Sequence, residues 1–167
     1  MKRLKITGIM ASDPSGVVGV GPHLPWDCPE ESAHFRRTVK GHMMIMGRKT
    51  YDATPSSALE GSVCFVLTRA ASIVAKDETH DLYTVNSPGA CLRKIQELPQ
   101  ERKIFLIGGA EIVRLFLESD LISDFILTKM HQCYAGDVIL DLKPFASWKE
   151  EILSTHKDYT IYHLEKP

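Results

Sequence analysis

The sequence lacks the features of membrane, nucleic-acid-binding and secreted proteins. No uncharged stretch reaches the about 18 residues of a transmembrane helix. The apolar run in the N-terminal MKRLKITGIM is too short for a signal peptide. No run of lysine and arginine exceeds two residues, and 20 basic against 21 acidic side chains leave a formal charge of −1. This balance argues against nucleic acid or an anionic membrane as the partner, but one or two local cations would still suffice for a phosphate.

Cysteine is sparse and scattered. Its four positions are Cys28, Cys64, Cys91 and Cys133. None of them forms a CxxC motif, and no histidine pair has the spacing of zinc ligands. This usage is typical of reduced, mostly buried thiols in a cytoplasmic protein, so we expect neither disulfides nor a metal site.

What remains is the composition of a globular domain. Of 167 residues, 44% are hydrophobic and 25% are charged, and there is no internal repeat, low-complexity tract or linker. We therefore expect a single domain over residues 1–167, large enough to bury a core without disulfides or metals.

Short apolar runs alternate with amphipathic segments, which is the pattern of a parallel α/β sheet. We expect buried strands at 4–11, 43–46, 63–67, 82–85, 103–107 and 125–130. Helices are expected at 29–40, at 87–98, directly after Gly47, and over 112–116. Residues 54–61 are polar and rich in turn formers, whereas 70–80 is a loop with room for a short strand at 73–74.

Three further strands are expected near the C-terminus, at 137–140, 148–155 and 159–165. No helical segment separates the last two, which are joined through His156-Lys157-Asp158. We therefore expect these two strands to pair in antiparallel fashion at the edge of the sheet.

The most informative acidic residue is Glu31. It follows the rigid turn Leu24-Pro25-Trp26, and Pro29 is suited to open the helix in which it lies. Glu31, Phe35 and Thr38 share one helical face, and Phe35 indicates that this face looks inward. A buried carboxylate needs a partner, and a ligand with paired N–H donors, such as an aminopyrimidine edge, would provide one. The alternative is a first-turn glutamate that favours the helix dipole and points to water.

Basic and hydroxyl residues directly follow two of the predicted strands. Gly47-Arg48-Lys49-Thr50 comes after 43–46, and Thr68-Arg69 comes after 63–67. Carboxyl ends of parallel strands meet at one edge of a sheet, where ligands collect. The N–H groups of a helix start, together with two cations, would bind a phosphate. A capped helix with two solvated cations would give the same pattern.

Gly108-Gly109 lies between the most hydrophobic predicted strand and a helix. Two glycines there would allow a pyrophosphate, or another backbone, to approach closely. The motif is not GxGxxG, and no acidic residue follows at the distance needed to bind a ribose, so a standard Rossmann site is not expected. A tight strand–helix turn without a ligand is the alternative.

Taken together, these motifs resemble those of the dihydrofolate reductase family. In order they are GVVG, LPW followed by Pro29-Glu30-Glu31, MIMGRKTY, VLTR, FLIGGAE and a late AGD, and they span nearly the whole chain. The resemblance implies a central, mostly parallel eight-stranded sheet with an antiparallel C-terminal strand and about four flanking helices. It also implies NADPH as hydride donor, a 7,8-dihydropterin as substrate, and a cytoplasmic monomer.

The resemblance assigns catalytic roles to three residues. Glu31 would hold the aminopyrimidine edge of the pterin, Trp26 would help to fix a water beside the nicotinamide, and the Thr128 hydroxyl would support Glu31. Substrate contacts are implied for Ala11, Glu31, Phe35, Arg36, Thr54 and Ile107.

The resemblance also implies a cofactor site. Residues 48–50 would contact the phosphates, Thr68 and Arg69 would lie near the 2′-phosphate, and the loop 16–21 would close over the nicotinamide. The full implied set is Val18, Gly19, Gly47, Arg48, Lys49, Thr50, Thr68, Arg69, Gly108, Gly109, Ala110 and Glu111.

The sequence departs from the family where the substrate's glutamate tail would bind. Ser62 stands at the place of an arginine that pairs with the tail's α-carboxylate, and serine cannot form that bidentate contact. Ser32 replaces an apolar residue, and Val113 stands where an aromatic residue often abuts the nicotinamide. Arg36, on the same helix as Glu31, is the alternative cation for the tail.

Two functions other than dihydrofolate reduction therefore stay open. One is reduction of a related dihydropterin that lacks the benzoylglutamate tail, and the other is binding of folate or NADP with weak activity or none. Glu31, Trp26 and Thr128 together argue against mere binding, because a binding protein would not need all three.

Overall fold

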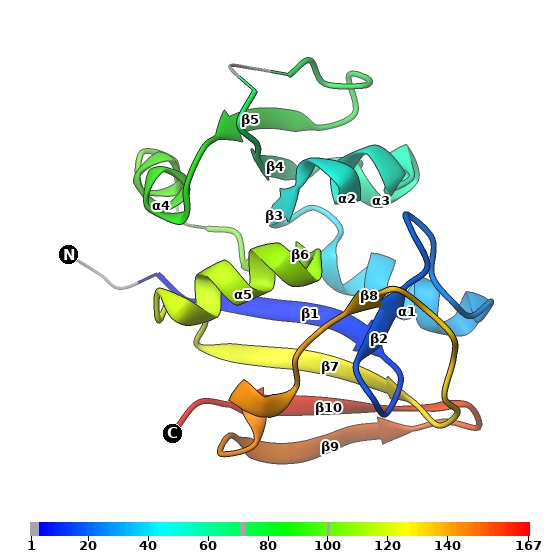
Figure 1. Ribbon diagram of the computed structural model, residues 1–167. Helices are drawn as coiled ribbons and strands as arrows, with labels where there is room; N and C mark the ends of the chain where they lie inside the picture. The colour runs from blue at the N-terminus through cyan, green and yellow to red at the C-terminus, as the bar shows by residue number, and fades with distance from the viewer. Residues whose placement is uncertain (1–3, 71–72, 100) are drawn as a thin grey trace.

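The computed structural model describes residues 4–70, 73–99 and 101–167, which are built around one eight-stranded sheet (Figure 1). Its strands are β1 (Ile6–Ser12), β3 (Met43–Gly47), β4 (Val63–Leu67), β5 (Asp81–Val85), β6 (Ile104–Gly108), β7 (Asp124–Met130), β9 (Lys149–Thr155) and β10 (Tyr159–Glu165). They lie in the order β5-β4-β3-β6-β1-β7-β10-β9. Neighbours from β5 to β7 are parallel, whereas β10 is antiparallel to both β7 and β9. The predicted α/β class and C-terminal hairpin are confirmed.

The helices are α1 (Pro29–Val39), α2 (Arg48–Ala53), α3 (Ser56–Leu59), α4 (Pro88–Gln96) and α5 (Ala110–Glu118), with a 3-10 turn at Lys143–Phe145. Pro29 occupies the first turn of α1, where its missing N–H has no intrahelical partner to lose. Ser87 caps α4, because its hydroxyl accepts the N–H of Ala90 at 3.0 Å. The described residues thus contain five α-helices, whereas about four were expected.

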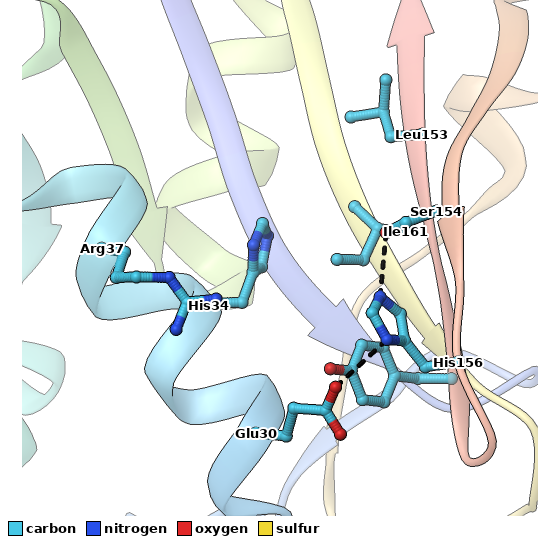
Figure 2. A pocket seen from close by; sticks show the side chains of 8 residues that line it. Glu30, His34, Arg37, Leu153, Ser154, His156 and Ile161 are labelled. Atoms are coloured by element: carbon cyan, nitrogen blue, oxygen red, sulfur yellow. Dashed lines mark hydrogen bonds and ion pairs between the residues drawn. The ribbon is translucent and has the colours of Figure 1, made fainter.

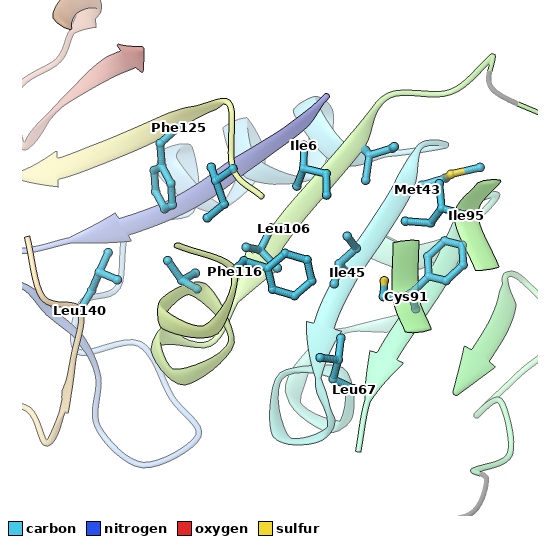
Figure 3. Close-up of a cluster of buried hydrophobic side chains, with 14 of the residues drawn as sticks. Ile6, Met43, Ile45, Leu67, Cys91, Ile95, Leu106, Phe116, Phe125 and Leu140 are labelled. Atoms are coloured by element: carbon cyan, nitrogen blue, oxygen red, sulfur yellow. The ribbon is translucent and has the colours of Figure 1, made fainter. Parts of the chain in front are cut away.

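The sheet is buried on both faces, and successive residues of its central strands face opposite sides. Ile45 belongs to a core shared with Ile95 of α4 and Phe116 of α5 (Figure 3). Met44 belongs to the opposite core, which includes Val39 at the end of α1. All five side chains are fully buried. Burial on two faces explains why residues 43–46 are continuously apolar rather than alternating.

A third cluster holds the chain after Trp26 against the end of the sheet. Trp26 packs with Met130, Tyr159 and Ile161, and its indole meets the Tyr134 ring edge-on at 5.4 Å. Aromatic pairs of this geometry add about 0.5–1.5 kcal/mol beyond the area that they bury. The cluster therefore fixes the segment that leads into α1.

Two local features differ from what the sequence suggested. Residues 56–59 form α3 inside a stretch predicted to be polar and rich in turns, and Ala58 and Leu59 bury its inner side. Residues 73–74 form no strand; the N–H of Ile73 instead bonds the Thr84 hydroxyl at 3.3 Å. Residues 71–72 of the predicted loop lie outside the described residues.

A separate two-stranded ribbon lies beside the main sheet. Strand β2 (Val17–Gly19), in the glycine-rich loop, pairs with β8 (Val138–Ile139) in antiparallel fashion. The predicted strand at 137–140 thus exists in shortened form, but β2 was not predicted. A Cβ on Gly136 would lie 2.5 Å from the Gly19 carbonyl oxygen, so only glycine fits at that approach.

None of the helices in the described part of the chain combines the length and the apolar character that crossing a membrane requires.

Candidate active site

The Glu31 carboxylate lies in an apolar environment. Its residue is 5% exposed, although it stands in the first turn of α1, where most acidic side chains reach water. Burial raises the pKa of Glu31 above its ordinary value, because the charged form loses hydration. The Trp26 indole N–H opposes part of this rise. The interpretation of Glu31 as a solvent-facing glutamate is therefore wrong.

Glu31 and Trp26 interact with each other, but weakly. The Trp26 Nε1–H is buried and makes no hydrogen bond of standard geometry with any described residue, although it lies close enough to the Glu31 carboxyl to limit the rise of its pKa. Within the described ranges, no cation forms an ion pair with Glu31. A carboxylate can accept several hydrogen bonds, so this one contact leaves acceptor capacity for a bound molecule or water.

Thr128 lies on β7 and is 2% exposed. The sheet register places it between Ala11 of β1 and Ile161 of β10. Because alternate residues of a strand face the same side, Thr128 shares its side of β7 with Ile126 and Met130. Thr128 therefore faces the same side of the sheet as the Trp26 cluster. No hydrogen bond joins its hydroxyl to Glu31 or to another described residue, so its supporting role stays a prediction.

The other predicted substrate contacts divide by exposure. Phe35 and Ile107 pack in one apolar cluster on the α1 face of the sheet. Thr54 is half-buried just after α2, where its hydroxyl donates to the Thr50 carbonyl at 2.6 Å. Arg36 is exposed on α1. We call Trp26, Glu31 and Thr128, with Ala11 and Phe35, the α1 side of the site.

A second group lies at the carboxyl ends of neighbouring strands β3, β4 and β6. Gly47 flanks the start of α2 and Gly109 flanks the start of α5, and neither helix receives a side-chain cap. The first-turn N–H groups therefore remain for solvent or a ligand. A Cβ on Gly109 would lie 3.6 Å from Thr50 Oγ1, so the two helix starts face the same region.

Gly108 has a backbone that requires glycine. Its φ is +129°, a conformation that L side chains rarely adopt, and its peptide bond to Gly109 is cis. A Cβ at this position would stand 3.6 Å from Met10 Cε and 3.8 Å from Thr50 Oγ1. Gly47, Gly108 and Gly109, with residues 48–50, 68–69 and 110–111, form what we call the glycine edge.

Positive charge gathers at the glycine edge. Lys49 and Arg69 are exposed and have no ion pair in the described part of the chain, whereas Arg48 Nε lies 3.2 Å from Asp52. Thr68 follows β4, and its hydroxyl accepts the N–H of Ala70 at 3.1 Å. Glu111 is held by Arg114 on its own helix, at 2.5 Å, and this contact lowers the pKa of Glu111.

Asp13 is a residue whose importance the sequence did not reveal beyond a turn. It is fully buried, and its carboxylate accepts the N–H groups of Ser15, Val17 and Tyr134, each at 2.9 Å. Burial alone would raise the pKa of Asp13, but these hydrogen bonds leave it lower than usual. Asp13 therefore ties the end of β1 to the start of β2 and to the loop that packs on Trp26, and so orders Val18 and Gly19.

A pocket of about 190 Å³ lies next to the site, between α1 and the C-terminal hairpin (Figure 2). Its α1 lining is Glu30, His34 and Arg37, one residue out of step with the Glu31 stripe and so rotated from it by about 100°. His156 reaches across to Glu30, with Nδ1 3.2 Å from the carboxylate. Glu31 is not in the lining, so this pocket is not the predicted substrate site.

Comparison with known proteins identifies the family. A family model described as dihydrofolate reductase matches residues 5–164. Dihydrofolate reductase of Lactococcus lactis is 33% identical over 132 residues, covering 79% of this chain and 75% of its own length. Dihydrofolate reductase type 8 of Escherichia coli is 30% identical over 167 residues, covering 98% of this chain and 96% of its own.

The chain belongs to the dihydrofolate reductase family. It is accordingly an oxidoreductase, and the resemblance stated from its motifs is confirmed. A putative dihydrofolate reductase of Caenorhabditis elegans is 28% identical over 158 residues, so the similarity extends beyond bacteria. The roles of individual residues in this member of the family stay predictions.

Proposed function

We propose that this protein reduces 7,8-dihydrofolate to 5,6,7,8-tetrahydrofolate with NADPH. The observation that carries the proposal is Glu31, a residue that is only 5% exposed and whose carboxylate forms no ion pair with a cation of the described residues. A 2-amino-4-oxo pterin offers two N–H donors on one edge, and a carboxylate accepts both with charge-assisted hydrogen bonds. Binding of the substrate would thus remove the cost of burying Glu31.

The residues of the glycine edge fit a dinucleotide phosphate. Uncapped N–H groups at the starts of α2 and α5, together with Lys49 and Arg69, present donors and positive charge without competing ion pairs on those two cations. Arg69 lies next to Thr68 at the end of β4, where the 2′-phosphate that distinguishes NADPH from NADH would be bound. NADPH would supply the hydride.

The chain's own contribution is orientation and control of a proton. Hydride adds to pterin C6 while N5 gains a proton, so the N5=C6 double bond becomes a single bond. Glu31 holds the pterin edge and, through the ring, increases the basicity of N5. The Trp26 indole N–H is buried beside the Glu31 carboxyl and makes no hydrogen bond of standard geometry with a described residue, so it is suited to hold the water from which that proton comes. Packing of Phe35 against the ring excludes other water.

Reduction of a dihydropterin without a glutamate tail is the second candidate, and the environment of Ser62 favours it. Ser62 is 2% exposed, and its hydroxyl accepts the Gly41 N–H at 3.1 Å, so it closes the end of α1 and offers nothing to a carboxylate. A different cation lies here. Arg102 Nη1 donates to the Gly61 carbonyl at 2.8 Å and to the Gly41 carbonyl at 3.2 Å.

The test measures NADPH oxidation with dihydrofolate and with dihydrobiopterin, which lacks the tail. The main proposal predicts a higher kcat/KM for dihydrofolate, and predicts that Arg102→Gln or Arg36→Gln raises the KM for dihydrofolate alone. A higher kcat/KM for dihydrobiopterin, with neither variant affecting dihydrofolate, would favour the second candidate. If neither substrate supports the oxidation of NADPH, both candidate functions are refuted.

A further inference from the structure

Helix α2 is too short to hold its own position. It has six residues, Arg48–Ala53, and carries Lys49 and Thr50 of the glycine edge on its first turn. Isolated helices of this length are unstable in water, so contacts from elsewhere must fix the direction in which α2 points. Tyr51 of α2 packs in the core against β3 and β4, and the polar contacts to the helix come from residues 76–80, in the loop between β4 and β5.

Tyr51 is the centre of these contacts. Its residue is 2% exposed, and its hydroxyl lies 2.6 Å from His80 Nε2 and 3.1 Å from the backbone N of Lys76. On the other side of the imidazole, His80 Nδ1 lies 3.3 Å from an Asp77 carboxylate oxygen. Tyr51, His80 and Asp77 thus form one continuous chain from α2 to the loop.

Only one arrangement of protons satisfies this chain. The Lys76 N–H can only donate to the Tyr51 oxygen, and the Asp77 carboxylate can only accept. The Thr79 hydroxyl also lies 3.3 Å from His80 Nδ1, but it donates to Asp77 and so can only accept from the imidazole. Tyr51 must therefore donate to His80 Nε2, and His80 must carry its proton on Nδ1. Protonation of both nitrogens would leave the buried Tyr51 hydroxyl with two donors and no acceptor. Burial raises the pKa of Tyr51, which keeps the phenol neutral and able to donate.

Lys76 makes a second attachment to the same helix. Its ammonium donates to the backbone carbonyls of Tyr51, at 2.8 Å, and of Thr54, and lies 4.8 Å from the centre of the Tyr51 ring. These carbonyls belong to the last turn of α2 and the residue after it. The Tyr51 carbonyl also accepts the Thr54 N–H at 3.3 Å, so Lys76 adds a charge-assisted bond to the end of the helix and complements its dipole.

We propose that Lys76 and His80 are positioning residues for α2, which aim the start of that helix at the cofactor. They touch no predicted ligand atom, and they act through Tyr51 and the last turn of α2. The inference rests on the proposed function, because it assigns α2 to NADPH. We call Lys76, Asp77 and His80 the α2 clamp.

The chain contains a matched control for the clamp. Lys94 Nζ lies 4.9 Å from the centre of the Tyr83 ring, which reproduces the stacking of Lys76 on Tyr51. Lys94 also pairs with Glu97 of its own segment at 3.2 Å, and the described contacts of this pair include none with α2. Lys94→Met and Tyr83→Phe therefore remove the same chemical groups without releasing the helix.

The kinetic test compares Lys76→Met and Tyr51→Phe with Lys94→Met and Tyr83→Phe. We expect Lys76→Met, which alters the clamp, and Tyr51→Phe, which removes its partner on α2, to raise the KM and Kd for NADPH about tenfold, while kcat stays within about twofold. Each variant loses buried or charge-assisted hydrogen bonds. The control pair should change neither constant. Equal effects in the two pairs, or a fall in kcat with KM unchanged, would overturn the inference.

A test independent of activity is nitrogen-15 NMR of the His80 ring, with hydrogen exchange at the Thr54 amide, which bonds the Thr50 carbonyl at 3.0 Å. We expect an Nδ1–H tautomer in the wild type and faster Thr54 exchange in Lys76→Met than in Lys94→Met. An Nε2–H tautomer, or equal exchange, would refute the clamp. Should the wild type fail to oxidise NADPH with any dihydropterin, the proposed function fails, and this measurement still decides the clamp.

Discussion

The α1 side and the glycine edge differ both in their exposure to solvent and in the groups that they offer to a ligand. On the α1 side, Glu31 and Trp26 are both buried, and no cation of the described residues pairs with the Glu31 carboxylate. At the glycine edge, Lys49 and Arg69 are exposed, and the donors are backbone N–H groups at uncapped helix starts. A flat heterocycle with N–H donors stabilises a buried carboxylate by supplying the hydrogen bonds that it lost with water. A dinucleotide phosphate, in contrast, needs only N–H donors and positive charge near the surface.

The largest expected effect breaks the α1 side alone. Glu31→Gln retains the shape of the side chain but removes the negative charge that orients the pterin and increases N5 basicity. We expect kcat with dihydrofolate to fall about 100-fold or more at neutral pH, the scale typical of lost acid–base assistance. Stopped-flow loss of NADPH absorbance measures it, and the Kd for NADPH should be unchanged. Undiminished turnover would remove Glu31 from the mechanism.

The next effect breaks the glycine edge alone. Gly108→Ala forces a side chain into a φ of +129°, so the turn must shift. Strain of this kind costs about 1–3 kcal/mol, and we expect the Kd for NADPH to rise about tenfold or more. Gly89→Ala is the control, because Gly89 lies in α4 and an added Cβ there makes only ordinary contacts, the nearest at 3.5 Å. The comparison fails if both variants bind NADPH as the wild type does.

A smaller effect sharpens the assignment within the glycine edge. Arg69→Gln removes an exposed cation with no ion pair in the described chain. We expect it to weaken the binding of NADPH only about fivefold, because solvent screens exposed charges. The affinity for NADH, which lacks the 2′-phosphate, should not change. Arg93→Gln, on the last turn of α4, tests whether any exposed arginine has this effect. Equal losses for NADPH and NADH would show that Arg69 does not select the 2′-phosphate.

The last effect is on stability rather than on ligand binding, and it concerns the ribbon beside the site. Asp13→Asn weakens three backbone hydrogen bonds and should lower the free energy of unfolding by about 1–3 kcal/mol, measured with urea. Since the folded pKa of Asp13 is lowered, its stabilisation is present above the ordinary value of 3.8 and is lost as pH falls through the folded pKa. The variant and the wild type should therefore converge in acid, and a constant difference at all pH values would contradict this origin.

The sequence predicted most of the sheet because its strands carry apolar residues on both faces. Residues 43–46 and 63–67 are short, continuous apolar runs, which are typical of strands that are buried on both faces of a parallel sheet. The strand β2, with its pairing to β8, and the helix α3 were missed, because each is short and depends on distant contacts. The pairing of β2 requires Gly136, which is more than a hundred residues away in the sequence. No pattern within residues 17–19 therefore predicts this strand.

The candidate site was predictable to a similar degree. Phe35, one turn after Glu31, indicated that this face of α1 points inward, and the structure confirms that Glu31 is buried. Asp13 and His80 could not be singled out in this way. Asp13 has the composition of an ordinary turn, and His80 gains meaning only when Tyr51 is folded against it. Their roles come from tertiary contacts rather than from residue type or spacing.

The role of Glu31 is tested most directly by a carbon-13 NMR titration of its carboxyl, with and without folate. We expect a pKa above the ordinary value of 4.5 in the free protein, because burial disfavours the charge, and a fall in this pKa when the pterin donates its N–H pair. An ordinary pKa in the free protein that folate does not change would contradict a buried, pterin-binding Glu31.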